Sequence, residues 1–148
     1  MTLEKYRKAR DFEKTTEPPG EAGDGSECIF VIQRHDARNL HFDFRMSLDG
    51  VLKSWAVPKE PPKEKGTRRL AIHTEDHPLS YAGFAGTIPK GQYGAGTVEI
   101  WDSGTFELED RKDAKIVFRL NGKRLSGKYV LLKFPKAGEN GWLFFRAD

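Results

Sequence analysis

Short apolar runs recur along residues 28–148, and most of them are bounded by residues typical of turns. Eight runs have the β-branched and aromatic content of strands: residues 28–33, 40–48, 51–57, 69–74, 97–102, 116–120, 128–134 and 141–146. Asp49-Gly50 lies between two of these runs and is typical of a two-residue hairpin, while Ser103-Gly104 and Asn121-Gly122 predict other tight turns. The rhythm predicts an all-β fold, a compact barrel of about eight short strands.

The first 27 residues follow a different pattern, with few apolar positions. A short helix is predicted over residues 3–12, and Pro18, Pro19 and the glycines after them disfavour further regular structure. We therefore expect a short helical or extended N-terminal arm over residues 1–27 and one domain over residues 28–148. Two longer connections, residues 58–67 and 75–96, are the segments where a β scaffold would carry a site.

Strict alternation between residues 40 and 46 gives the most informative pattern. One face of this strand carries Leu40, Phe42, Phe44 and Met46. The other face carries His41, Asp43 and Arg45, whose spacing lets the first two share a metal ion while the guanidinium reaches a bound anion. His35, just upstream, is a candidate third ligand. A half-buried strand whose outer face is polar without any site stays open as the alternative.

Two further features have ambiguous signals. His73 and His77 are four residues apart, which on a helix is the spacing of a zinc pair, but residues 69–72 favour a strand and Pro78 disfavours helix at His77. We interpret His73 as an ordinary strand residue and leave the role of His77 open. The glycine-rich segment 91–96 lacks the Lys-Ser/Thr ending of a phosphate-binding loop and is interpreted as a turn.

Composition and charge narrow the class of protein. The 148 residues carry a net charge of +3 and a pI near 9.0, an excess that favours contact with phosphate without deciding it. Abundant aromatic residues exclude global disorder. The single Cys28 cannot form an internal disulfide and, at the start of an apolar run, is predicted to be a core residue. Without a signal segment or a membrane span, a cytoplasmic protein is expected.

Seven sequence blocks occur in one order and cover nearly the whole chain: YRKARDF at 6–12, HDAR at 35–38, LHFDFR at 40–45, LKSWAVPK at 52–59, TEDHPL at 74–79, IPKG at 88–91 and YGAGTV at 93–98. Together they resemble the 3′-phosphoesterase family, which occurs as the N-terminal domain of bacterial DNA ligase D and as free-standing proteins. The chain departs from the family at Ala85 and Lys90, where Glu is usual, so no acid role is expected at those two positions.

The resemblance implies a β-barrel with a crescent-shaped polar groove and a manganese ion held by His35, His41 and Asp43, where zinc or cobalt could also bind. It further implies that catalysis uses His41 and Asp43 together with residues that engage the reacting phosphate. These phosphate-contacting residues are Arg45, His77 and Tyr81. Positional matching places Gln33, Lys59 and Arg69 at the groove, and Arg10, Asp11 and Glu17 in the arm.

The activity implied by the resemblance has two steps. A phosphodiesterase removes a 3′-terminal ribonucleoside, and a phosphomonoesterase then removes the remaining 3′-phosphate to leave the hydroxyl that ligation needs. The implied partners are DNA or DNA/RNA 3′ ends of a primer-template, with a separate DNA ligase and polymerase, and no membrane. In this interpretation the chain is a free-standing, manganese-dependent hydrolase of DNA repair.

Two other functions stay open on the residues alone. His41 and Asp43 with a distant histidine also match the ligand set of nonheme iron oxygenases, although that reading leaves Arg45 unexplained. A barrel that only binds nucleic acid would use stacking aromatics, whereas the suspected face carries His, Asp and Arg.

Overall fold

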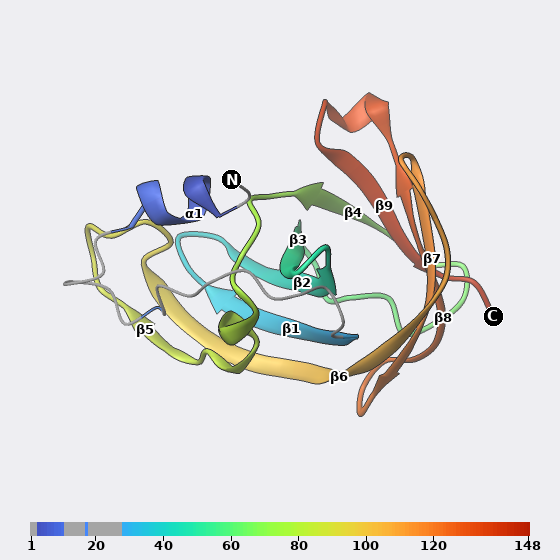
Figure 1. Ribbon diagram of the computed structural model, residues 1–148, viewed down its shortest axis with the longest axis horizontal. Helices are drawn as coiled ribbons and strands as arrows, with labels where there is room; N and C mark the ends of the chain where they lie inside the picture. Colours follow the sequence, from blue (N-terminus) through green and yellow to red (C-terminus); the bar gives the residue numbers. More distant parts are fainter. Residues whose placement is uncertain (1–2, 11–16, 18–27) are drawn as a thin grey trace.

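The computed structural model describes residues 3–10, 17 and 28–148 of the chain. Helical structure is confined to α1 (Glu4–Lys8) and two short 3-10 turns, η1 (Leu79–Gly83) and η2 (Pro135–Ala137), within these residues. The strands are β1 (Ile29–Asp36), β2 (Leu40–Leu48), β3 (Val51–Val57), β4 (Arg68–His73), β5 (Gly86–Ile88), β6 (Gly96–Lys112), β7 (Lys115–Gly122), β8 (Ser126–Lys133) and β9 (Gly141–Arg146). The predicted all-β fold is confirmed (Figure 1).

The sheet closes on itself. Its hydrogen-bonded order is β1-β2-β3-β4-β9-β8-β7-β6-β5, and β1 also pairs with β6, so eight antiparallel strands form a closed barrel. Short β5 lies outside this circle and pairs with the first residues of β6. The predicted barrel of about eight strands is therefore confirmed, with β5 as an addition that the apolar pattern did not indicate. The division into an arm and a domain at residue 27 stays a prediction.

One long strand explains a wrong turn prediction. β6 pairs with β1 through residues 97–105 and with β7 through residues 104–112, so Ser103-Gly104 lies inside a strand and not at a turn (Figure 1). A Cβ at Gly104 would collide with the carbonyl of Asn121, which shows that glycine is needed here for close strand approach. Asn121-Gly122 ends β7, and the turn follows it.

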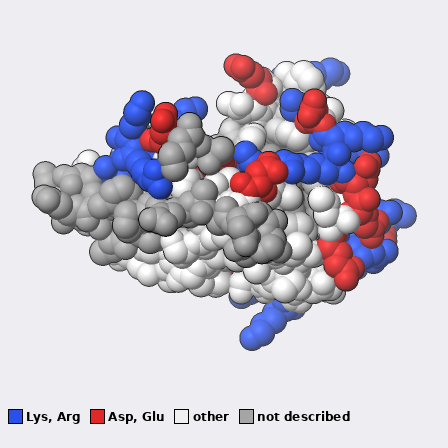
Figure 2. Space-filling view, viewed as in Figure 1, with Lys and Arg blue, Asp and Glu red and all other residues white. Residues whose placement is uncertain are grey.

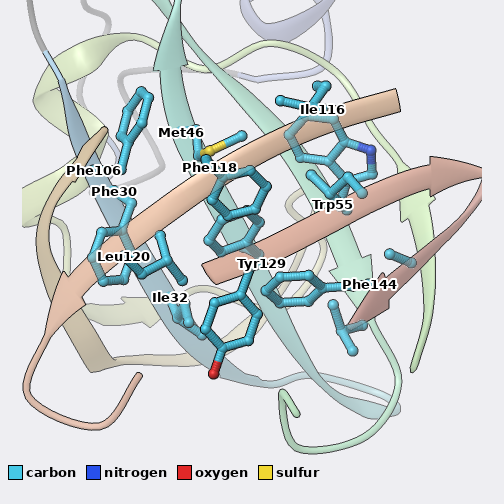
Figure 3. Packing of buried hydrophobic residues seen from close by; sticks show 14 of the residues in the cluster. Phe30, Ile32, Met46, Trp55, Phe106, Ile116, Phe118, Leu120, Tyr129 and Phe144 are labelled. Atoms are coloured by element: carbon cyan, nitrogen blue, oxygen red, sulfur yellow. The ribbon is translucent and has the colours of Figure 1, made fainter. Parts of the chain in front are cut away.

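The barrel interior is filled by aromatic side chains (Figure 3). Phe44 of β2 stacks on Phe118 and Phe144, with ring centroids 5.8 and 4.7 Å apart. The inward face of β2 is thus the predicted one, except that Leu40 is 43% exposed, because it lies beyond the end of the core. Cys28 is exposed, so its predicted core position is wrong; it lies just before β1, where its carbonyl accepts a hydrogen bond from the backbone N–H of Phe106 at 3.1 Å.

The other face of β2 is buried as well. A second apolar cluster packs there, formed by Tyr6 of α1, Leu52, Tyr81 of η1, Phe84, Ile88 and Val98. The N-terminal helix and the long connection after β4 therefore cover the polar face of β2, which the sequence alone left as an outer surface. None of the helices in the described part of the chain is long and apolar enough to cross a membrane.

Candidate active site

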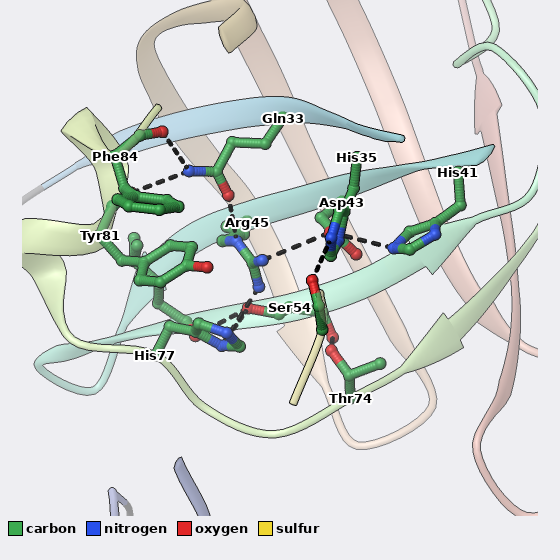
Figure 4. Close-up of polar contacts among 12 residues, drawn as sticks. Gln33, His35, His41, Asp43, Arg45, Ser54, Thr74, His77, Tyr81 and Phe84 are labelled. Atoms are coloured by element: carbon green, nitrogen blue, oxygen red, sulfur yellow. Dashed lines mark hydrogen bonds and ion pairs between the residues drawn. The ribbon is translucent and has the colours of Figure 1, made fainter. Parts of the chain in front are cut away.

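Two neighbouring strands bring the predicted ligands together. His35 of β1 is the cross-strand partner of His41 on β2, and Gln33 is the partner of Asp43. Paired residues of antiparallel strands point to the same face of the sheet. The side chains of His35, His41, Asp43 and Arg45 accordingly gather on one side of the barrel wall (Figure 4).

The two histidines and Asp43 have the geometry of a metal site. Asp43 Oδ2 lies 3.5 Å from His35 Nδ1 and 3.2 Å from His41 Nε2, and one ligand atom from each residue falls within 4.8 Å of the others. Two imidazole nitrogens and one carboxylate suit a divalent transition metal.

Backbone carbonyls select the histidine tautomers that such a site needs. His35 Nε2 donates to the carbonyl of Gly94 at 2.7 Å, and His41 Nδ1 donates to the carbonyl of Asn39 at 3.1 Å. In both rings the opposite nitrogen, which faces Asp43, is the one left to bind a metal. The donor set therefore fits a metal in its ligand types and in the orientation of both rings.

The charges around Asp43 favour its ionised form. Burial alone would raise the pKa of Asp43, but the Arg45 charge and hydrogen bonds from His35 and His41 outweigh it and hold that pKa below the usual range. The hydrogen bond to Asp43 in turn raises the pKa of His41, against the effect of burial. The site is thus set to hold a cation, either a proton on His41 or a metal ion in its place.

Arg45 is fixed between partners on both sides. Its Nε donates to Gln33 Oε1 at 2.7 Å, and its Nη2 lies 3.4 Å from Asp43 Oδ2. The Gln33 amide donates both of its hydrogens to carbonyls, those of Tyr81 at 2.9 Å and Phe84 at 3.0 Å. Gln33 therefore holds Arg45 in position, and both of its amide hydrogens are bonded within the protein.

His77 is held in the same wall by both its backbone and its ring. The backbone forms an isolated bridge with Leu52 of β3, and the ring meets Tyr6 and Tyr81 edge-on, with centroids 5.0 and 4.7 Å away. Nδ1 lies 3.1 Å from Arg45 Nη1. Burial, followed by the charges of Arg45 and Arg10, lowers the pKa of His77 well below its ordinary value, so the ring is neutral near neutral pH.

The N-terminal segment contributes a buried polar network. Arg10 Nε lies 2.9 Å from Glu17 Oε2, and its Nη1 lies 2.6 Å from Glu75 Oε1. The Tyr81 hydroxyl donates to the same Glu17 oxygen at 2.6 Å, and burial raises the pKa of Tyr81. The structure thus brings Arg10, Glu17 and Tyr81 to the site, while Asp11 lies outside the described residues.

A cavity of about 230 Å³ joins these groups. Among its lining residues are Arg10, Glu17, His35, His41, Asp43, Arg45, His77 and Tyr81. Lys59 and Arg69 line a different hollow of about 240 Å³, and Arg69 Nε donates to the carbonyl of Glu60. Their predicted place at the groove stays a prediction, because the structure groups them with each other and not with the metal ligands.

Several other lining residues were not selected from the sequence, and three of them have a clear place in the site. Glu75 pairs with Arg10, Tyr93 lies at the rim, and Gly94 supplies the carbonyl that orients His35. All three fall inside the TEDHPL and YGAGTV blocks, which were the available signal. The glycine-rich segment 91–96 does form turns, but the Gly94 carbonyl gives it a part in the site.

Comparison with known proteins identifies the family of the chain. Residues 33–133 match the model of the DNA ligase D 3′-phosphoesterase domain. The chain is 52% identical over 139 residues to the multifunctional non-homologous end joining DNA repair protein LigD of Mycobacterium tuberculosis, covering 88% of this chain and 18% of that protein.

Two further LigD proteins are similar over almost the whole chain. Identity is 46% over 157 residues with that of Mycolicibacterium smegmatis and 43% over 154 residues with that of Pseudomonas aeruginosa, covering 97% and 98% of this chain. The chain spans only about a fifth of the length of these relatives. On this similarity and the family match, the chain belongs to the DNA ligase D 3′-phosphoesterase domain family.

Proposed function

We propose that this protein is a metal-dependent phosphoesterase that heals 3′ ends in DNA end-joining repair. It removes a 3′-terminal ribonucleoside as a phosphodiesterase and then the remaining 3′-phosphate as a phosphomonoesterase. The observation that carries the proposal is the pair of carbonyl-bound histidines, His35 and His41, whose free nitrogens face Asp43 next to the guanidinium of Arg45.

Manganese is the proposed metal, with zinc and cobalt as substitutes, and His35, His41 and Asp43 would hold it. When bound, the ion supplies a Lewis acid for a nonbridging phosphate oxygen. Nitrogen ligands and a carboxylate together favour such metals over calcium or magnesium, which prefer oxygen ligands.

Arg45 and His77 are the proposed phosphate contacts. Both line the cavity beside the ligand cluster, and Arg45 presents its Nη atoms toward Asp43 and His77. A guanidinium in this place offsets the charge that grows on phosphate oxygens during hydrolysis. The neutral ring of His77 lies against Arg45 and becomes a proton donor only after the anionic substrate raises its pKa from the lowered value that burial produces.

The proposed substrates are DNA or DNA/RNA primer-templates with a 3′-terminal ribonucleotide or 3′-phosphate. The three relatives are end-joining proteins by name. A DNA ligase and a polymerase are the proposed partners, because the hydroxyl end produced here is the substrate that ligation requires.

The test incubates the protein and manganese with a labelled primer-template that ends in one ribonucleotide, and resolves the product ends. Matched primers ending in a deoxyribonucleotide and in a 3′-phosphate separate the two steps. We expect loss of the terminal ribonucleoside, then of the phosphate, and neither reaction in Asp43→Asn. Asp110→Asn, an equivalent change at an exposed carboxylate of β6, is the control and should retain both.

Unchanged primer ends in the presence of manganese would refute the proposal. Primer binding without cleavage would favour the binding-only barrel, and metal-dependent consumption of oxoglutarate would favour the oxygenase. The family match gives neither alternative support.

A further inference from the structure

Tyr93 is an exposed aromatic side chain at the rim of the active-site cavity. At 52% it is the most exposed of the five large apolar side chains that face solvent among the described residues. The other four do not line this cavity, whereas Tyr93 does. Tyr6 and Tyr81 are also aromatic but are at most 2% exposed. Tyr93 is therefore the aromatic ring beside the ligand cluster that has surface available for stacking.

A glycine-rich turn holds this ring next to a metal ligand. The backbone N–H of Ala95 donates to the carbonyl of Gln92 at 3.1 Å, and Gly94 has a φ angle of 76°, as the third residue of a type II turn requires. Tyr93 is the second residue of this turn. The carbonyl of Gly94 accepts the hydrogen bond from His35 Nε2 at 2.7 Å. Consecutive residues of one turn thus fix both the exposed ring and the proposed metal ligand.

A buried cation supports the ring of Tyr93. Arg10 Cζ lies over this ring, 5.1 Å from its centroid, and the Arg10 side chain is 5% exposed. Ion pairs with Glu17 at 2.9 Å and with Glu75 at 2.6 Å hold the guanidinium in place. A cation over a ring face is attracted to the π electrons, so this contact orients the ring. The exposed surface of the ring is then available to a second planar group.

Tyr93 lines two adjoining cavities. Beyond the active-site cavity lies a hollow of about 640 Å³, within the usual range of about 300–1,000 Å³ for small-molecule sites. The two cavities share Thr74, Glu75 and Tyr93. Asn140 adds an amide to the lining of the hollow. The hollow therefore opens from the proposed reaction centre, and it combines one aromatic ring with groups that form hydrogen bonds.

The charges that line this hollow balance. They are two lysines, Lys5 and Lys53, and two carboxylates, Glu75 and Asp76. His73, also in the lining, has a pKa lowered by burial and is neutral near neutral pH. The outer surface of α1 differs, because Lys and Arg side chains predominate there (Figure 2). A neutral polar ligand therefore suits the hollow, whereas a phosphate favours the basic surface outside it.

We propose that the hollow receives the nucleoside that leaves in the diesterase step, with its base stacked on Tyr93. The proposal rests on the proposed function, because that function supplies the reaction. In the diesterase step water adds its hydroxyl group to phosphorus, the bond from phosphorus to the 5′ oxygen of the terminal nucleoside breaks, and this oxygen takes the proton. The group that departs is a neutral nucleoside, which fits the balanced charge of the hollow.

The two proposed reactions make different demands on Tyr93. In the monoesterase step the bond from phosphorus to the 3′ oxygen of the primer breaks, and no nucleoside lies beyond the phosphate. Tyr93 then has no base to contact. Stacking tolerates every base, so the contact should favour the diesterase step without a preference among the four bases.

The ratio of the two activities tests this difference. Tyr93→Ala should lower kcat/KM of the diesterase relative to that of the monoesterase roughly tenfold, within the range for one stacked base. Tyr93→Phe keeps the ring and should keep the ratio. Leu108→Ala removes an exposed apolar side chain of β6 outside the cavity lining and is the control. Equal losses in both reactions would show that Tyr93 only supports the turn that orients His35, and would overturn the proposal.

A primer whose terminal ribose carries hydrogen in place of the base isolates the contact. The wild type should cleave this primer roughly tenfold less efficiently than the primer with the base. Tyr93→Ala should cleave both primers equally, because the partner of the base is already absent. The same difference between the primers in Tyr93→Ala as in the wild type would place the base elsewhere and overturn the proposal.

Binding to the protein with manganese provides a readout without turnover. A methylene group in place of the 5′ oxygen of the terminal nucleoside gives a primer that cannot be cleaved there, because hydrolysis would have to break a carbon–phosphorus bond. Fluorescence anisotropy should show roughly tenfold tighter binding with the base than without it in the wild type and in Tyr93→Phe. Tyr93→Ala should bind both primers equally.

These measurements separate the nucleoside site from the proposed function. Binding that does not depend on the base in the wild type, with cleavage intact, would refute this inference and leave the proposed function standing. Binding that depends on both the base and Tyr93, without cleavage of any primer, would refute the proposed function and leave the nucleoside site.

Discussion

The two faces of β2 are both buried, but they are buried by different means. Phe42, Phe44 and Met46 face an apolar core in which any well-packed neighbour contributes. Asp43 and Arg45 on the opposite face are 6% and 4% exposed, and each has polar partners at specific atoms. A buried charge is tolerated only with such partners, so each residue type on the outward face is required by its contacts. On the inward face, an apolar side chain of similar volume would serve nearly as well.

The largest expected loss of stability comes from a substitution on the inward face of β2. Phe44→Ala removes a ring that stacks on Phe118 and Phe144, and should lower the free energy of unfolding by about 3–5 kcal/mol. Urea denaturation measures this change. Leu40→Ala, on the same strand face but 43% exposed, should cost less than about 0.5 kcal/mol. Similar losses in both variants would contradict the contrast between core and edge.

On the outward face, Arg45→Lys should reduce the rate of both proposed reactions by about 10²–10³-fold, the typical loss for a donor to a charged transition state. A lysine cannot contact Gln33, Asp43 and a phosphate at once, because it lacks the planar fork of arginine. Steady-state rates on the ribonucleotide primer measure the effect. Arg119→Lys, an exposed guanidinium beside Glu109, is the control. Near-normal rates in Arg45→Lys would show that a point charge suffices.

A metal ion bound on the outward face of β2 should raise the free energy of unfolding of the protein. At about 100 times its dissociation constant, a bound ion adds about 2.7 kcal/mol. For a chain of this size that raises Tm by about 5–10 °C. Thermal unfolding with and without manganese measures the shift, which His41→Ala should abolish because the variant lacks one ligand. The shift should also shrink at acidic pH, because the hydrogen bond to Asp43 raises the pKa of His41 and a proton then competes with the metal. An unchanged shift in His41→Ala would exclude this site.

The smallest expected effect is a pH dependence from His77. Burial and then the charge of Arg45 lower the pKa of His77, so below about pH 6.5 the unfolded chain binds a proton that the folded chain does not. The metal-free protein should therefore lose stability through His77 as the pH falls below that value. His77→Gln should lack this component.

Urea unfolding of both proteins between pH 7.5 and 5 isolates the His77 component. The opposite contribution of His41, whose pKa the hydrogen bond to Asp43 raises, is present in both proteins and cancels in the difference. If the free energy of unfolding fell more steeply with acidification in His77→Gln than in the wild type, a lowered pKa of His77 would be contradicted.

Strands with a clear local pattern were predictable to the residue. β2, β3 and β9 have the predicted bounds, and Asp49-Gly50 forms the predicted hairpin with φ angles of 57° and 78°. β5 and the second half of β6 were missed, since β5 has three residues and the extension of β6 is mostly exposed and charged. Their strand conformation depends on pairing with neighbours, which no local pattern records.

The sequence by itself determined the β class, the inward face of β2, the shared outward face of His41, Asp43 and Arg45, and, through its seven blocks, the family. The alternation of apolar and polar residues along a strand involves only neighbouring positions, so it can be recognised in the sequence alone. The tertiary structure alone decided what covers that outward face and how each group is held. Gly94 orients His35 from 59 residues away, and Glu17 meets Tyr81 across 64 residues. Such contacts fix tautomers and protonation through burial and distance, quantities that exist only once the barrel has closed.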